Sequence, residues 1–152
     1  MPVEVGFYRC TRQPMAAVAV RLADKTLAAG RRLLLAAEET LLDELDRRLW
    51  TDLPESFLAH GRSDSPEAAR QPILLAGPSD IRAPAGNGAS FLMLLGLPLP
   101  APLSAWERVF LLFEAEGEAE ATARAAWRAL GGEPDVVRSF WEQTGGRWVK
   151  AA

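Results

Sequence analysis

Cysteine and histidine are nearly absent from this sequence, where Cys10 and His60 are the only residues of their kind. A single cysteine excludes an internal disulfide, and one cysteine with one histidine gives no pair of metal ligands. We therefore expect no metal, no cofactor and a reducing compartment. No apolar run approaches the roughly 20 residues that span a bilayer, and the first residues carry no basic segment. These absences predict a cytoplasmic protein without membrane contact.

An excess of positive charge is also missing. The chain has 17 basic and 20 acidic residues, a formal net charge of −3. Nonspecific binding to nucleic acid depends on Lys and Arg that neutralise phosphates, so broad affinity for DNA or RNA is disfavoured. A local basic patch is still compatible with this balance, and so is stacking of single-stranded DNA on exposed tryptophans. A protein of this charge that works near DNA is expected to do so through another protein.

Glycine-rich phosphate loops are the third absence. After the first apolar stretch, where such a loop is expected in a nucleotide-binding protein, the sequence has Cys-Thr-Arg-Gln-Pro at residues 10–14. Gly86-Asn87-Gly88 is an isolated pair of glycines with no helix behind it. The sequence therefore contains no recognisable phosphate-binding motif.

Cys10 and His60 remain as candidates for catalysis. A thiol needs a base or positive surroundings to ionise, and only Arg9 and Arg12 are close to Cys10 in sequence, so a buried core cysteine is the competing interpretation. His60 has no ligand partner at metal spacing, which favours a structural histidine bonded to a backbone group. A small α/β enzyme that processes nucleotides or phosphate, using loops near Cys10 and Gly86, stays as the alternative function.

What the sequence does contain is typical of one globular domain covering residues 1–152. It has 152 residues, of which 49% are hydrophobic and 24% charged. This length suffices for a core without disulfides. Short apolar runs between turn residues predict strands, and helical spacing of apolar residues predicts helices. The expected strands are 3–10, 33–37, 72–76, 90–97 and 109–114, and the expected helices are 14–29, 40–50 and 116–130.

Alternation of these elements predicts an α/β fold: one three-layer domain with a mainly parallel sheet of about five strands flanked by helices. Pro14 suits the first position of the first helix and Gly30 its C-terminal cap. Thr40 and Asp43 approximate a capping box for the second helix. Its buried stripe is expected to be Leu42, Leu45 and Leu49, and that of the last helix Ala119, Ala123, Trp127 and Leu130. The segment after residue 132 shows no clear period.

Aromatic residues flank a proline in the stretch from Trp50 to His60, which reads Trp-Thr-Asp-Leu-Pro-Glu-Ser-Phe-Leu-Ala-His. Large aromatic side chains are costly to leave in water, so Trp50 and Phe57 either pack under this loop or are held out for a partner. The chain has five tryptophans in total, and two or three of them are expected in the core.

Cationic residues lie beside an aromatic one on the last predicted helix. Arg124 and Arg128 are four residues apart, so they share a face next to Trp127. Two guanidinium groups beside an aromatic ring suit a carboxylate followed by an apolar side chain. The competing interpretation is a solvated face on which Glu120 pairs with Arg124. The acidic run 114–120 fits the N-terminus of this helix, whose dipole favours negative charge.

Several motifs, taken in order, resemble the chi subunit of bacterial DNA polymerase III, an accessory protein of the clamp loader. They are Phe7-Tyr8, Gly30-Arg31-Arg32-Leu33, Leu49-Trp50, Pro54-Glu55-Ser56-Phe57-Leu58-Ala59-His60 and Trp148. The most specific part is the series between residues 49 and 60. The resemblance covers nearly the whole chain, with residues 61–102 matching in pattern only.

Members of that family have no catalytic activity. They join the psi subunit, and so the clamp loader, to the acidic C-terminal tail of single-stranded-DNA-binding protein, and they also associate with a helicase of the damage response. The resemblance implies that this chain is a bacterial cytoplasmic adaptor in DNA replication, brought to the nucleoid by the replisome. Its contact with nucleic acid is then indirect.

The same resemblance implies two binding surfaces. It assigns Trp50 and Phe57 to the psi subunit and the helicase. It assigns Arg124, with Trp127 and Phe113 as apolar neighbours and Arg128 one turn on, to the tail of single-stranded-DNA-binding protein. That tail ends in acidic residues and a C-terminal Phe, so it needs a cation for the carboxylate and an aromatic floor for the ring.

One position departs from the family pattern. Chi proteins can carry a lysine one helical turn before the pocket arginine, where this chain has Glu120. An acid there is expected to repel an acidic tail and to compete for Arg124. We therefore expect weaker tail binding, or a larger contribution from Arg128.

Overall fold

The computed structural model describes residues 2–152. Its α-helices are α1 (Met15–Ala28), α2 (Glu39–Thr51) and α3 (Glu118–Leu130). Its strands are β1 (Val3–Cys10), β2 (Leu33–Ala36), β3 (His60–Arg62), β4 (Ile73–Ala76), β5 (Phe91–Leu95), β6 (Arg108–Glu114), β7 (Val136–Thr144) and β8 (Arg147–Lys150).

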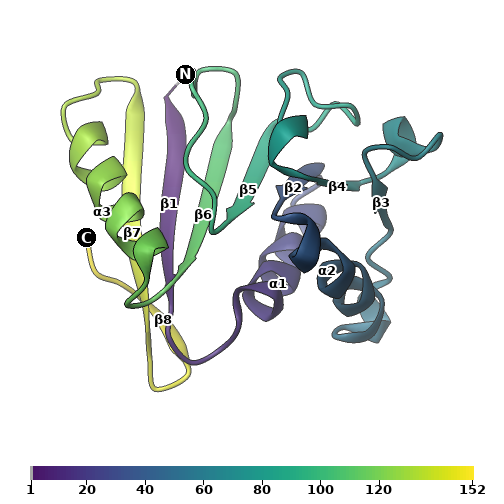
Figure 1. The fold of residues 1–152 in the computed structure, drawn as a ribbon, viewed down its shortest axis with the longest axis horizontal. Helices are drawn as coiled ribbons and strands as arrows, with labels where there is room; N and C mark the ends of the chain where they lie inside the picture. The colour runs from purple at the N-terminus through teal and green to yellow at the C-terminus, as the bar shows by residue number, and fades with distance from the viewer. Residues whose placement is uncertain (1) are drawn as a thin grey trace.

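All eight strands belong to one sheet in the order β3-β4-β2-β5-β6-β1-β7-β8 (Figure 1). Neighbouring strands are parallel except at one edge, where β8 runs antiparallel to β7. The prediction of an α/β fold with a mainly parallel sheet is confirmed. The five predicted strands correspond to β1, β2, β4, β5 and β6, and the sheet adds β3, β7 and β8 at its edges.

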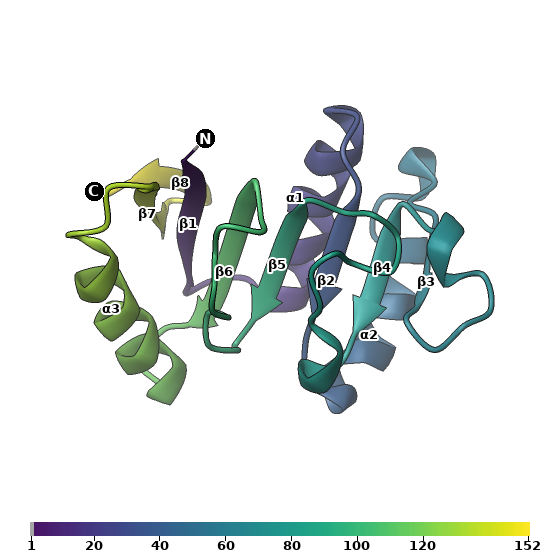
Figure 2. The ribbon, with the colours of Figure 1, turned by 90° about the horizontal axis from the view of Figure 1, so that it is seen from above.

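Helices cover both faces of the sheet, as the three-layer prediction requires. The apolar sides of α1 and α2 pack on one face, in a cluster that includes Leu35, Met93 and Leu112. The other face is covered by α3 and by the loops around β5, in a cluster that includes Leu94 and Phe113. Figure 2 shows α3 at one end of the sheet and α2 towards the other. The strands between them are buried on both sides, which explains their continuous apolar sequences.

The helix boundaries follow most of the predicted signals. Gly30 has φ +77°, a conformation that favours glycine, and it follows the end of α1. Pro14 precedes α1 as its N-cap and does not occupy the first helical position. Leu42, Leu45 and Leu49 are buried on α2 as expected.

The predicted capping box of α2 is wrong. The N-cap residue is Glu38, no side chain caps it, and Thr40 lies inside the helix. Asp43 turns outward and pairs with Arg62. The connection from β2 is only two residues long, so the helix must begin before Thr40 can act as a cap.

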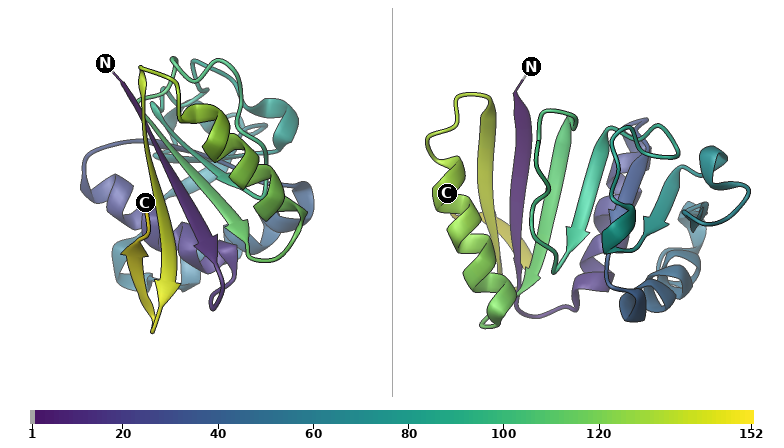
Figure 3. Two further views of the ribbon diagram at one scale, coloured as in Figure 1. Left: turned by 90° about the vertical axis from the view of Figure 1, so that its left-hand side faces the viewer. Right: turned by 45° about the horizontal axis from the view of Figure 1, so that its top comes forward.

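The segment after α3, which shows no clear period in the sequence, forms the β7–β8 hairpin along one edge of the sheet (Figure 3, left). β7 pairs with β1, so the first strand of the chain lies inside the sheet beside a late one. Trp141 and Trp148 are partly buried on the face that α1 covers. Within residues 2–152, no helix combines the length and apolar character needed to cross a membrane.

Candidate functional site

Trp50 and Phe57 are both on the surface, close to the β3 edge of the sheet. Trp50 lies in the last turn of α2 and is 55% exposed, and Phe57 follows the 3₁₀ turn Pro54–Ser56 and is 81% exposed. Of the five tryptophans, Trp106 is buried, three are partly buried and only Trp50 is exposed. A stacking platform for single-stranded DNA made of several tryptophans is therefore absent.

His60 fixes the position of Trp50. The two rings lie 4.4 Å apart between centroids, and the imidazole is buried beneath the exposed indole. His60 Nδ1 is 2.7 Å from the Leu58 carbonyl oxygen, and Nε2 is 2.8 Å from a carboxylate oxygen of Asp46. Both partners are acceptors, and the tautomer decides which ring nitrogen donates. The prediction of a structural histidine bonded to the backbone is confirmed.

Asp46 was not singled out in the sequence, although a signal for it exists. It precedes Trp50 by four residues on α2, so the two side chains lie on the same face of that helix. We call Asp46, Trp50, Phe57 and His60 the aromatic surface.

Phe57 has an unusual backbone conformation. Its φ of 48° and ψ of 60° fall in the left-handed region, which costs a residue with a β-carbon about 1–2 kcal/mol. The backbone oxygen of Phe57 accepts a hydrogen bond from the Ala59 amide at 2.9 Å, and this bond helps to hold the turn. The strained conformation directs a large apolar ring into solvent, which is costly for the free protein and characteristic of a binding site.

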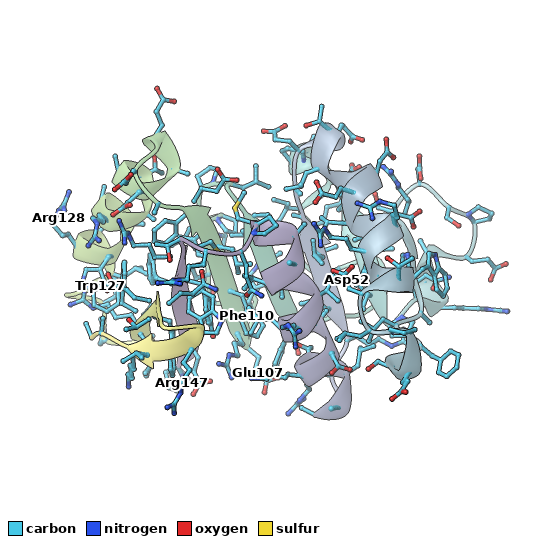
Figure 4. All side chains as sticks on the ribbon, turned by 90° about the horizontal axis from the view of Figure 1, so that it is seen from below. Asp52, Glu107, Phe110, Trp127, Arg128 and Arg147 are labelled. Carbon is cyan, nitrogen blue, oxygen red and sulfur yellow. The ribbon has the colours of Figure 1, made fainter. Side chains whose placement is uncertain are left out.

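Acidic residues surround the aromatic surface. Residues 38–55 contain seven Asp or Glu and two Arg, a net charge of −5 against −3 for the whole chain. Arg48 is held between Glu44 at 2.8 Å and Asp52 at 3.0 Å, so its charge is locally balanced. Asp52 follows the end of α2 and lies away from α3 in Figure 4. The electrostatic environment of the aromatic surface therefore favours a partner with positive charge.

At the other end of the sheet, Glu120 is the centre of an ionic network on α3. Its two carboxylate oxygens accept hydrogen bonds from Arg9 Nε at 3.0 Å, Arg124 Nε at 2.8 Å and the Glu116 amide at 2.7 Å. These hydrogen bonds lower the pKa of Glu120 to about 2. The bond from the Glu116 amide has the largest effect, those from Arg124 and Arg9 add to it, and together they outweigh the opposing effect of desolvation. The competition of Glu120 for Arg124, expected from the sequence, is present in the structure.

Phe140 of β7 connects the residues assigned to the tail pocket. The Arg124 guanidinium lies 5.0 Å from the centre of its ring, and the rings of Trp127 and Phe113 meet it edge to face at 5.6 and 5.9 Å. Phe113 itself is fully buried, so it supports Phe140 from below and does not face solvent. The sequence gives no signal for Phe140, because residues 136–144 carry no regular period and only the pairing of β7 with β1 places it here.

Two further arginines complete this region, which we call the α3 pocket. Arg138 lies 3.9 Å from the Trp127 ring centre and donates a hydrogen bond to the Trp127 carbonyl. Arg128 is exposed, and no ion pair among residues 2–152 involves it. In Figure 4 Arg128 extends outward from α3 and Trp127 lies nearer the sheet. Arg128 is thus the cation best placed to meet an incoming carboxylate without first breaking an ion pair.

The residues considered for an enzyme do not converge. Cys10 is buried at the carboxyl end of β1, and burial, with Glu114 adding to it, raises the pKa of its thiol to about 12. The 86–88 loop lies at the amino ends of the strands, because the Asn87 amide donates to the Leu33 carbonyl at 3.2 Å and to the Gln71 carbonyl at 2.9 Å. The two features therefore lie at opposite ends of the strands. No group of three metal-ligating side chains occurs within residues 2–152.

Comparison with known proteins gives two concordant results. The family model for the DNA polymerase III chi subunit, HolC, matches residues 2–133. The DNA polymerase III subunit chi of Pseudomonas aeruginosa is 33% identical over 112 residues, which are 73% of this chain and 75% of that protein. The family match includes the aromatic surface and α3, and it ends before β7.

Proposed function

Since the chain belongs to the family of DNA polymerase III chi subunits, we propose that it is a non-catalytic adaptor of the polymerase III holoenzyme. In this role it bridges the psi subunit, and so the clamp loader, to the C-terminal tail of single-stranded-DNA-binding protein. It works in the cytoplasm at the replisome, reaches nucleic acid only through these partners and does not engage a membrane. The same aromatic surface can also receive a damage-response helicase.

The observation that carries this proposal is the exposed aromatic pair. Trp50 is held over a buried His60, and Phe57 is held in a strained backbone conformation that points its ring at solvent. Rigid aromatic groups lose little entropy on binding and are typical of binding hot spots. A psi or helicase segment that fits here presents an apolar side chain flanked by Lys or Arg, because the surrounding segment has a net charge of −5.

The α3 pocket supports the second contact. Arg124 and Arg128 supply cations, the partly buried Trp127 supplies aromatic surface, and the buried rings of Phe140 and Phe113 support it from within. A peptide that ends in an aromatic residue can place its carboxylate on Arg128 and its ring against Trp127. To use Arg124 as well, the peptide has to displace Glu120 from that guanidinium.

The two contacts are far enough apart to operate together. The aromatic surface adjoins β3, the first strand of the sheet order, and Phe140 lies in β7, the seventh. Six strand spacings of about 4.8 Å separate them by roughly 30 Å. One molecule can therefore hold both partners at once.

A crossed binding experiment tests the proposal. Phe57→Ala is expected to weaken binding of the psi subunit about 30-fold and to leave binding of an acidic tail peptide ending in Phe unchanged, and Arg124→Ala is expected to do the reverse. Calorimetric titration measures both partners. Val149→Ala and Arg70→Ala, at other exposed positions, are the matched controls. Equal damage to both contacts by both variants would contradict the two-surface proposal.

A further inference from the structure

A second cavity lies on the opposite face of the sheet from α3, between α1 and the β7–β8 hairpin. Five aromatic side chains line it, together with two cations. The aromatic residues are Tyr8, Phe91, Phe110, Trp141 and Trp148, and the cations are Lys25 and Arg108. We call it the aromatic pocket; in Figure 4 Phe110 lies between α1 and the hairpin.

The aromatic pocket encloses about 330 Å³, at the lower end of the range of about 300–1,000 Å³ that is usual for small-molecule sites. Its floor depends on a missing side chain. A β-carbon at Gly6 would lie 2.9 Å from Tyr8 Cε1, so the absence of a side chain lets the tyrosine ring lie back across β1. Trp141 stacks parallel to Tyr8 at 6.2 Å, and Trp148 meets it edge to face at 5.4 Å. These contacts hold the ring as a rigid floor.

The two cations of the aromatic pocket are less neutralised than Arg124. Arg108 lies 4.9 Å from the Phe110 ring centre, and its ion pair with Glu4 is long, at 3.8 Å. Lys25 is exposed in the last turn of α1, and no ion pair within residues 2–152 involves it. Burial raises the pKa of Tyr8, against the opposing effect of Arg108, so the hydroxyl stays protonated at neutral pH and can donate a hydrogen bond.

We propose that the aromatic pocket binds a small carboxylate that carries a single aromatic ring. The ring packs against Tyr8 and Trp148, and the carboxylate meets Lys25 and Arg108 at the rim. The volume suits one ring with its acid group, and the two cations favour an anion over a neutral ligand. This inference is independent of the adaptor function, because the pocket shares no residue with the aromatic surface or the α3 pocket.

Titration of the full chain with N-acetyl-L-phenylalanine tests the inference, with tryptophan fluorescence and amide NMR shifts as readouts. We expect saturable shifts at Trp141, Trp148 and residues around Lys25, with a Kd on the order of 1 mM or below. The neutral analogue N-acetyl-L-phenylalaninamide should bind at least about 5-fold more weakly, because it cannot pair with the cations. Equal affinity for the acid and the amide would overturn the proposal, and so would the absence of a saturable shift.

Variants separate this pocket from the α3 pocket. Lys25→Gln combined with Arg108→Gln should weaken binding of the acid about 10-fold and leave the amide unaffected. Gly6→Ala should displace Tyr8 and reduce binding of both, and Arg70→Gln is the control for an exposed arginine elsewhere. Arg124→Ala should leave this binding intact. Loss of binding in Arg124→Ala, with shifts confined to α3, would place the ligand in the α3 pocket and reject the inference without affecting the adaptor proposal.

Discussion

The two ends of the sheet differ in the exposure of their aromatic side chains and in their net charge. Beside β3, Trp50 and Phe57 are exposed and the surrounding segment, residues 38–55, has a net charge of −5. At the other end, Phe113 of β6 and Phe140 of β7 are buried, and residues 118–152 contain five acidic and five basic residues, a net charge of zero. The aromatic rings are therefore exposed at the β3 end of the sheet, whereas at the α3 end they are buried beside ion pairs.

This difference predicts two kinds of binding. Both rings of the aromatic surface are already held on the surface of the free protein by His60 and the turn at Phe57, so the proposed partner would meet them in place. The α3 pocket has to exchange an internal carboxylate for an external one, because Glu120 occupies Arg124. In the proposed adaptor, the cost of that exchange would lower the affinity for a tail and would make binding there depend on the charge state of Glu120.

The largest effect is expected at Phe57. Phe57→Gly should weaken psi binding about 30-fold, because it removes the most exposed ring of the aromatic surface. The same change should leave the free energy of unfolding unchanged or raise it by up to about 1 kcal/mol, because glycine adopts the left-handed conformation without strain. Calorimetry and urea unfolding measure the two quantities.

Phe57→Ala is the matched control for this change. It removes the ring and keeps the β-carbon, so binding should fall as in Phe57→Gly without the gain in stability. A marked loss of stability in both variants would show that the ring supports the fold, and the contrast between the two ends of the sheet would fail.

A smaller effect is expected at Glu120. Glu120→Gln should strengthen binding of an acidic tail peptide ending in Phe about 10-fold, because it frees Arg124 and removes a repelling charge. Gln keeps an oxygen that can accept the hydrogen bond from the Glu116 amide, so the start of α3 is preserved. Titration calorimetry measures the gain, with Glu133→Gln as the control for an exposed acid. Unchanged or weaker tail binding would mean that Glu120 does not limit this pocket.

The smallest effect is expected in the dependence of stability on pH. The pKa of Glu120 is about 2 in the folded protein, against an ordinary value of 4.5 that applies to the unfolded chain. Ionised Glu120 therefore stabilises the fold above pH 4.5. This contribution declines as the pH falls from 4.5 towards 2. We expect about 1 kcal/mol, because the partner Arg124 is half exposed and solvent screens the pair.

Urea unfolding of the native chain and Glu120→Gln checks this dependence. The variant should be less stable at pH 7, and the gap should close near pH 2. A gap that persists unchanged at pH 2 would assign the stability difference to packing and not to the charge of Glu120.

Much of the fold could be predicted because its central strands are buried on both faces. Residues 33–36 and 73–76 are continuous apolar runs, which need no knowledge of their neighbours to be recognised. The edge strands give no such signal. β3 has only three residues, His60–Arg62, and β7 is only partly covered, so both are defined by hydrogen bonds to strands that the local sequence does not reveal.

The candidate sites divide in the same way. Trp50 and Phe57 could be selected from the sequence because two aromatic residues next to a proline are unusual in a loop. Their support by Asp46 and the strain at Phe57 could not, because both depend on how the chain turns after α2. Phe140 was out of reach for a similar reason, since it joins Arg124 only through the pairing of β7 with β1.

The position of β1 inside the sheet has a consequence for synthesis of the protein. The strands that surround α2 all lie within residues 33–95, so the Trp50 end can assemble while the rest of the chain is still on the ribosome. Val3 pairs with Val136, so the α3 end has to wait until β7 has emerged. In a newly made molecule the Trp50 end of the sheet can therefore fold first, and the α3 end, which carries Arg124, folds last.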